Sequence, residues 1–352
     1  MRAFWKVLLK GLKILLAALV LLEIASFLII TGSNYYIYGQ FHETEAVRYD
    51  PYAIYINLKG ERPTLNNPPE RANSQVLTLW MFGGSTTRGV SADDSKTLPS
   101  FLARELNQVP PALPARVVNF GVDGFNSLLE SKYLQKMLIE SPSAPDVVIF
   151  YDGANDCTYF NQYRTPYAHH GYRQLKGLVE SYHQSPIGLL KPLTAAWFTC
   201  LTRELWDKMH QGVLPLSPDD AALKEYAQSV VQRYDYVNKV ARCFGATFFL
   251  IWQPFWWVET EAVTPALKQQ EEQDIILSRR LALKHNFVIA HRELTRHLRG
   301  KSYFVDFTNI LCSRQQLVYE SDGIHLNPAG DHLVAQTIGR FLKEKLKRRP
   351  PD

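Results

Sequence analysis

Five short apolar runs, each followed by glycine or polar residues, most constrain the fold of this 352-residue chain. Segments with the 3.6-residue period of helices separate them. Runs of this length are typical of strands buried on both faces, and strands that alternate with helices favour a parallel sheet. The sequence therefore predicts a three-layer α/β/α fold around a central, mainly parallel sheet. The predicted strands cover residues 76–82, 116–120, 146–151, 246–252 and 303–307.

The helices expected between these runs carry local end signals. Gly245 stands where a glycine commonly follows a helix, and Asn327 followed by Pro328 is typical of an N-cap and a first helical residue. Between residues 158 and 217 the pattern is interrupted by aromatic residues and prolines, and we interpret this segment as an insertion over one edge of the sheet. The predicted helices cover residues 98–106, 128–139, 221–243, 266–285 and 327–347.

Residues 14–31 form an apolar run that indicates a transmembrane helix. As a helix the run would be about 27 Å long, close to the thickness of the hydrocarbon layer. Basic residues precede it, whereas no Lys or Arg follows until Arg48. The positive-inside rule then predicts a cytoplasmic N-terminus, with the remaining chain periplasmic or extracellular. The basic residues before the run are Arg2, Lys6, Lys10 and Lys13.

Two alternatives at this run stay open. Thr31, Gly32 and Ser33 are small residues of the kind found at signal-peptide cleavage sites, although the run is long for a signal peptide and favours an uncleaved anchor. Glu23 is the only charged residue in the run. It is either a tolerated, protonated carboxyl or a contact to another helix, and the sequence does not choose between them.

The remaining organisation follows from composition. We expect a basic cytoplasmic segment at 1–13, the anchor at 14–31, a polar tether at 32–75 and one globular domain at 76–352. A charged fraction of 21% argues against wholesale disorder. The net charge of +5 is mild and its basic residues gather at the two ends, so we expect no nucleic-acid partner.

Cysteine usage gives less information. An exported domain can form disulfides, but the sequence does not select a pairing among four cysteines. We find no Cys/His pattern that predicts a metal site, and the adjacent pair His169 and His170 is poorly spaced for one ion. The cysteines are Cys157, Cys200, Cys243 and Cys312.

Polar motifs follow three of the predicted strands, where ligand sites form in parallel sheets. Ser85 comes after Gly83 and Gly84, in a turn that can expose its hydroxyl. Residues 119–127 contain Gly121 and Gly124, which leave backbone free to approach a substrate oxygen. Asn155 follows the third run, where its amide could donate a hydrogen bond to a developing oxyanion. Each motif alone is also compatible with an ordinary turn or helix cap.

A fourth motif, residues 322–328, precedes the last predicted helix. Asp322 and His325 are three residues apart in a loop, so both side chains can turn inward. The carboxylate could then orient the imidazole and stabilise its charged form.

Together the four motifs, in this order, resemble those of the SGNH/GDSL hydrolase family over about residues 76–347. The resemblance implies that Ser85 is the nucleophile, His325 its base and Asp322 the partner of that base. It also implies an oxyanion hole made by the Ser85 N–H, the Gly124 N–H and the Asn155 amide, with Gly121 as the alternative to Gly124. The usual Gly-Asp-Ser reads Gly-Gly-Ser here. The implied chemistry needs no cofactor and no metal.

An aromatic segment follows the run at 246–252. Phe255, Trp256 and Trp257 either pack at the rim of the domain or form a platform for sugar rings or an acyl chain.

The resulting hypothesis is a membrane-anchored serine esterase or O-deacetylase that acts on an exported glycan or lipid. Two alternatives share these residues: an O-acyltransferase acting on an envelope polysaccharide, and a catalytically silent domain that binds polysaccharide. The sequence leaves open the acyl group, its carrier, protein partners and the oligomeric state.

Overall fold

The computed structural model describes residues 1–38, 41, 46–69, 76–91, 93–108, 114–184, 188–210, 214–260, 263–275 and 281–346. The chain divides into two compact units. Unit 1 comprises Met1–Glu43 and Gly171–Val213, and unit 2 comprises Thr44–His170 and Leu214–Asp352.

Unit 2 is built around a five-stranded sheet in which every pairing is parallel, so the predicted α/β fold is confirmed. The strand order is β4-β3-β5-β6-β7. The chain moves one way from β3 to β4 and the opposite way from β4 to β5, which makes the carboxyl ends of β3 and β5 a topological switch point. Ligands commonly bind at such points. The strands are β3 (Leu77–Gly83), β4 (Ala115–Gly121), β5 (Val147–Asp152), β6 (Thr247–Trp252) and β7 (Phe304–Asp306).

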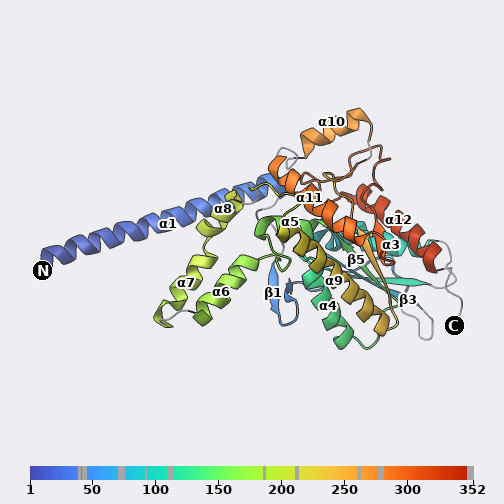
Figure 1. The fold of residues 1–352 in the computed structure, drawn as a ribbon, viewed down its shortest axis with the longest axis horizontal. Helices are drawn as coiled ribbons and strands as arrows, with labels where there is room; N and C mark the ends of the chain where they lie inside the picture. The colour runs from blue at the N-terminus through green and yellow to red at the C-terminus, as the bar shows by residue number, and fades with distance from the viewer. Residues whose placement is uncertain are drawn as a thin grey trace. The chain divides into compact units, whose positions relative to one another are not determined.

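Helices cover both faces of this sheet (Figure 1). On one face α3 (Leu98–Asn107) packs against α12 (Pro328–Leu346). On the other, α9 (Ala221–Cys243) packs against α4 (Ser127–Glu140) and α11 (Leu281–Leu298).

The core between these layers is strongly aromatic. The ring of Phe82 stacks on Phe120 with centroids 4.9 Å apart and meets Tyr133 edge to face. Phe82 and Phe150 are fully buried. Burial of each such side chain stabilises the fold by about 1.5–3 kcal/mol, which holds the ends of β3, β4 and β5 in register.

The structure differs from the sequence prediction at residues 266–285, where one helix was expected. It has two, α10 (Pro265–Asp274) and α11, and α11 continues to Leu298. Residues 276–280 and the predicted helix end at 347 lie outside the described residues.

The predicted tether at 32–75 also differs. Helix α1 continues to Tyr38, and residues 46–69 belong to unit 2. Here β1 (Val47–Asp50) and β2 (Ile54–Asn57) form an antiparallel hairpin. The side chains of Tyr55 and Ile56 in this hairpin are buried in the main hydrophobic core of unit 2. Residues 70–75 lie outside the described residues.

The regular elements in the described parts of unit 1 are all helices. Unit 1 contains α1 (Arg2–Tyr38), α6 (Tyr172–Gln184), a 3-10 turn at Gly188–Leu190, α7 (Lys191–Thr199) and α8 (Leu201–His210). The insertion predicted at 158–217 thus corresponds to α6–α8, whereas residues up to Tyr163 extend α5 (Ala154–Tyr163) of unit 2.

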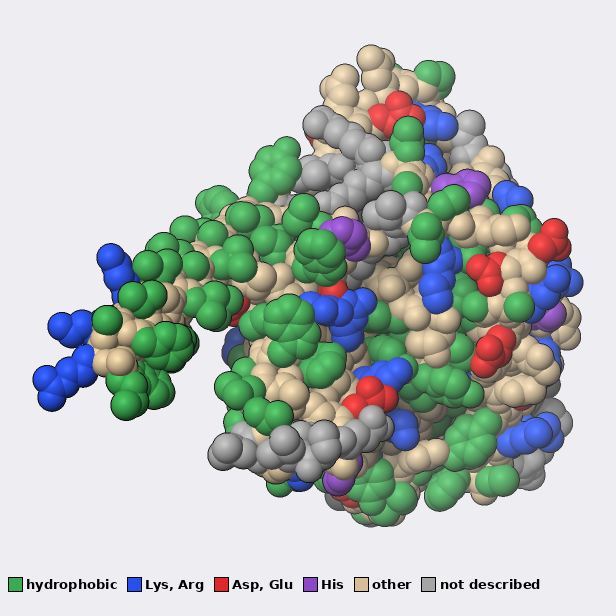
Figure 2. All heavy atoms as spheres, turned by 60° about the vertical axis from the view of Figure 1, so that its left-hand side comes forward, with side chains coloured by type: hydrophobic (Ala, Val, Ile, Leu, Met, Phe, Trp, Pro, Cys, Tyr) green, Lys and Arg blue, Asp and Glu red, His purple; other side chains and the backbone are tan. Residues whose placement is uncertain are grey.

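Within the described chain, α1 is the one helix whose length and composition would let it cross a membrane, a property that signal sequences share. Figure 2 shows hydrophobic side chains along its exposed part and basic side chains gathered at its free end.

Candidate active site

Ser85 lies at the carboxyl end of β3, where it begins the short helix α2 (Ser85–Arg88). Gly84 is the residue before it. A Cβ atom at position 84 would stand 2.5 Å from Asn155 Nδ2 and 3.0 Å from Phe125 O. The glycine therefore lets the amide of Asn155 approach the turn that carries Ser85, at the position where the family pattern has Asp.

The C-terminal loop brings a histidine to this serine. Ser85 Oγ lies 2.7 Å from His325 Nε2. On the other side of the ring, His325 Nδ1 hydrogen-bonds and ion-pairs with Asp322 Oδ2. The other oxygen of Asp322 accepts the N–H groups of Ile324 and His325, each at 2.9 Å. Asp322 thus fixes both the ring and the backbone that carries it.

Burial and charge determine the protonation of this pair. Burial lowers the pKa of His325, but the charge of Asp322 and its hydrogen bond outweigh burial and raise that pKa above its ordinary value. Burial raises the pKa of Asp322, yet the charge of His325 and the hydrogen bonds to the carboxylate bring that pKa below its ordinary value. Asp322 is consequently ionised at neutral pH and favours the charged imidazole.

The three expected oxyanion donors follow the carboxyl ends of the neighbouring strands β3, β4 and β5. Asn155, near the start of α5, donates one amide hydrogen to Phe125 O at 2.6 Å and keeps a second. Gly124 has φ +72°, a conformation that favours glycine. We find no protein acceptor among the described residues for the N–H groups of Gly124 and Ser85.

The alternative glycine, Gly121, is placed differently. Its N–H donates to Asn119 Oδ1 at 2.9 Å, so this donor is already engaged. A Cβ atom at Gly121 would lie 2.3 Å from the Arg88 nitrogen, which indicates that this glycine serves close backbone packing. Of the two glycines, Gly124 is the one with a free donor.

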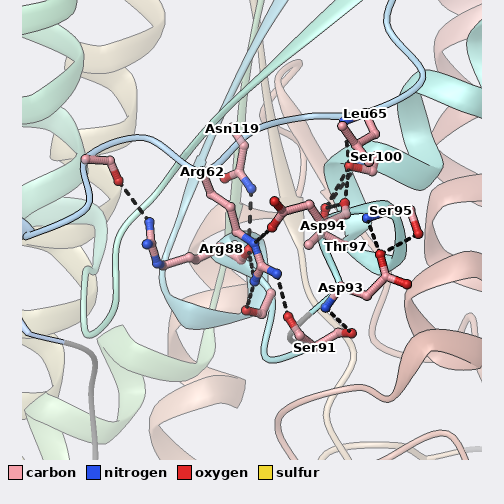
Figure 3. Close-up of polar contacts among 12 residues, drawn as sticks. Arg62, Leu65, Arg88, Ser91, Asp93, Asp94, Ser95, Thr97, Ser100 and Asn119 are labelled. Carbon is pink, nitrogen blue, oxygen red and sulfur yellow. Dashed lines mark hydrogen bonds and ion pairs between the residues drawn. The ribbon is translucent and has the colours of Figure 1, made fainter.

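Arg62, from the segment expected to be a tether, secures the chain after α2 (Figure 3). Its guanidinium donates to the carbonyls of Arg88, Gly89 and Ser91, and it bonds Asp94 Oδ1 at 2.8 Å. The side chain is 12% exposed. Sequence reasoning missed this residue because no periodic pattern or motif surrounds it.

The aromatic segment packs behind the His325 loop. The exposed fractions of Phe255, Trp256 and Trp257 are 1%, 9% and 7%, which favours packing over an open platform. The backbone N–H of Trp256 donates to Gly323 O at 2.9 Å, and its indole N–H donates to Glu271 Oε2 at 3.0 Å.

A buried cluster of ion pairs lies next to the aromatic segment. Arg314 ion-pairs with Glu271 at 2.7 Å and with Glu259 at 2.8 Å. Tyr319 donates to the same carboxylate of Glu259 at 2.6 Å. The cluster ties the aromatic segment to the chain that leads into the His325 loop.

His170 is a second residue that the sequence did not single out for this site. A Cβ atom on Gly124 would stand 3.0 Å from His170 Cβ and 3.0 Å from the Tyr55 hydroxyl. Tyr55 also donates to Asp123 O at 3.1 Å. His170 and Tyr55 therefore pack closely around the backbone at Gly124. The neighbouring His169 hydrogen-bonds to the His170 carbonyl through Nδ1 at 2.7 Å.

A doubly wound α/β sheet with a Ser–His–Asp chain at its switch point is an arrangement typical of hydrolases with a serine nucleophile. The sequence model of the GDSL-like Lipase/Acylhydrolase family matches residues 81–266, and the chain belongs to this family. The protein is accordingly a carboxylic ester hydrolase of the SGNH/GDSL type. The match includes Ser85, Gly124 and Asn155 and ends before Asp322 and His325.

Several solved structures are similar at low identity. TesA is 14% identical, over 76% of this chain and 98% of that one, with a TM-score of 0.38. The lipase/acylhydrolase from Enterococcus faecalis is 15% identical over 78% and 99%, with a TM-score of 0.38. Axe2, an acetylxylan esterase from Geobacillus stearothermophilus, is 18% identical over 77% and 94%, with a TM-score of 0.37. No curated protein matches the sequence.

Proposed function

We propose that the enzyme cleaves acyl esters through a covalent intermediate on Ser85, with His325 as base and Asp322 as the partner of that base. The observation that carries the proposal is the 2.7 Å contact between Ser85 Oγ and His325 Nε2. This contact is within the range for proton transfer, and the other ring nitrogen is held by a carboxylate.

The reaction would proceed in two steps. Ser85 Oγ attacks the ester carbonyl while His325 Nε2 takes its proton, and the carbonyl oxygen becomes an oxyanion between the Ser85 N–H, the Gly124 N–H and the Asn155 amide. His325 returns the proton to the alcohol that leaves. Water then attacks the acyl carbonyl while His325 Nε2 takes its proton. His325 passes this proton to Ser85 Oγ as the bond between that oxygen and the acyl carbon breaks, which releases the carboxylic acid and restores the free serine.

The substrate we propose is an acyl ester of an exported glycan or lipid. The apolar run at 14–31 and the basic residues before it support a catalytic unit outside the cytoplasm. Retention of α1 as an anchor is supported by Glu23, whose carboxylate accepts the N–H and the hydroxyl of Thr202 in α8 at 3.0 and 2.8 Å. A cleaved α1 would leave this end of α8 without that acceptor.

Hydrolysis of p-nitrophenyl acetate by the detergent-solubilised full chain, without added metal, tests the proposal. Ser85→Ala should lower kcat/KM by about 10⁴-fold or more, because members of a catalytic triad act as a unit. An unchanged rate in this variant would remove Ser85 from the reaction. Repeating the assay with an acceptor glycan distinguishes hydrolysis from acyl transfer: faster release of p-nitrophenol with acylated glycan as product would indicate a transferase.

A further inference from the structure

Glu23 ties the apolar helix α1 to the helices of the insertion. Its carboxylate accepts the Leu201 N–H at 2.5 Å and the Thr202 N–H at 3.0 Å. These are the first two residues of α8, whose N–H groups have no partner inside their own helix. Ser26, less than one turn further along α1, donates to Thr202 Oγ1 at 3.3 Å.

This contact lies at the depth of the apolar run rather than beyond it. Glu23 stands inside residues 14–31, and the face of α1 that is buried continues through Ser26 and Ile30. In a hydrocarbon layer both an ionised carboxylate and unsatisfied N–H groups are strongly unfavourable. Here each satisfies the other, which is the arrangement that a lipid environment requires.

The insertion exposes large apolar side chains on every one of its three helices. They recur at the helical spacing of three or four residues, so each helix presents one apolar face. Leu193 is 68% exposed and Met209 67%. The exposed residues are Val179 and Tyr182 in α6, Leu193 and Trp197 in α7, and Trp206 and Met209 in α8.

Basic side chains lie beside aromatic rings at these apolar faces, as is common in the headgroup region of a bilayer. Arg203 lies over the ring of Trp197, 5.6 Å from its centroid, and Lys191 lies over Tyr182 at 4.6 Å. Aromatic rings with basic side chains beside them are typical of the headgroup region. The acidic side chain of Asp207 is ion-paired with Arg203 at 3.3 Å and also with Arg173, so this carboxylate is neutralised near the apolar faces.

We propose that α6–α8 form a second membrane element, seated in the outer leaflet against the outer half of α1. The occupant of their apolar faces is lipid, because these helices belong to the same compact unit as the apolar helix and one of them, α8, begins at its Glu23. The inference rests on the proposed membrane span of α1. The enzyme would then contact the bilayer through the insertion α6–α8 as well as through the N-terminal helix α1.

The test uses spin labels on the full chain in liposomes of phosphatidylcholine and phosphatidylglycerol. Cys200 and Cys243, the two more accessible cysteines, are replaced with Ser. Labels are then placed singly by Leu193→Cys and Met209→Cys. Leu19→Cys, in the exposed part of α1, reports the membrane span, and Ile139→Cys, exposed on unit 2, reports water. Power saturation compares collisions with oxygen, which concentrates in lipid, and with a water-soluble nickel chelate.

We expect the labels at 193 and 209 to collide more with oxygen than with nickel, as at 19, and the label at 139 to show the reverse. Adding Glu23→Ala should shift position 209 toward nickel. Water-like values at 193 and 209 with a lipid-like value at 19 would overturn the inference while leaving the anchor intact. Low collision with both reagents at 193 and 209 would mean that a protein covers these faces, which also overturns it. A water-like value at 19 would instead refute the anchor itself.

Discussion

Ser85 and His325 are 240 residues apart in the chain, yet their Oγ and Nε2 atoms lie 2.7 Å apart. The first follows β3, an interior strand of the sheet, and the second lies in the loop before α12, which packs with α3 on one face. The pairing of Ser85 with His325 therefore depends on the whole of unit 2 being folded.

The pH dependence of hydrolysis should report the His325–Asp322 pair. Activity needs the neutral imidazole, and the pKa of His325 is raised above its ordinary value of about 6.5, so kcat/KM should rise with pH through a limb centred above 6.5 and then level off. Asp322→Asn removes the charge that raises this pKa. Its limb should move to lower pH while the plateau falls by about 10⁴-fold. A limb that stays in place would separate Asp322 from the titration.

His332 provides the internal control for that experiment. It lies in α12, where its Nε2 atom meets Glu105 Oε1 at 3.2 Å and its ring packs on Phe101 at 5.1 Å. These contacts join α12 to α3 and do not involve Ser85. His332→Ala should leave kcat/KM within about twofold, whereas His325→Ala should remove most of the rate. The opposite result would show that the C-terminal motif has been assigned to the wrong histidine.

The Asn155 amide should stabilise the transition state rather than the bound substrate. Asn155→Ala removes a side-chain donor from the oxyanion site, so kcat should fall by about 10²–10³-fold with little change in KM. Thr158, one turn further along α5 and also half-buried, is the matched control, and Thr158→Ala should have nearly normal kinetics. Equal effects of the two substitutions on kcat would indicate a general disturbance of α5.

Gly124→Ala tests the backbone donor. The added methyl group would meet His170 and Tyr55 at 3.0 Å, in a conformation with φ +72° that alanine rarely adopts. The N–H at this position should shift, and kcat should fall by more than tenfold while the far-ultraviolet circular dichroism stays unchanged. Normal kinetics in a folded Gly124→Ala variant would exclude this N–H from the site.

Arg62 should matter for stability as well as for rate. Arg62→Ala removes the side-chain donor from the carbonyls of Gly89 and Ser91 and leaves Arg88 O with only its longer bond from Asn119. We expect the free energy of unfolding in urea to fall by about 2–3 kcal/mol. Lys96→Ala removes an exposed ion pair to Asp93 and should change stability by less than about 0.5 kcal/mol. Similar losses in the two variants would show that the contacts of Arg62 are no stronger than a surface pair.

Much of this architecture follows from local patterns. The five strands appear where the apolar runs predict them, and three of these strands end at Gly83, Gly121 and Asp152, because a strand buried on both faces needs a continuous apolar run. Ser85, Asn155 and His325 could be predicted since their motifs follow strand ends or precede a helix. Their convergence comes from sheet order, which no local pattern encodes.

Other parts depend on tertiary contacts without a periodic signal. Arg62 acts on carbonyl groups, and a sequence does not reveal which carbonyls need a donor. Strand β2, which contains Tyr55 and Ile56, is only 4 residues long, so its sequence alone does not distinguish it from a loop. The choice at Glu23 between a tolerated carboxyl and a helix contact depended on the position of α8, about 180 residues away, which only the structure supplies.

The central claim is that Ser85 is activated by His325 as the nucleophile. The most direct measurement is labelling of the full chain with a fluorophosphonate, followed by mass spectrometry of the proteolysed adduct. We expect a single modified peptide with the phosphonyl group on Ser85, formed slowly in His325→Ala and not at all in Ser85→Ala. Unchanged labelling of Ser85→Ala, or an adduct on a different serine, would contradict the account.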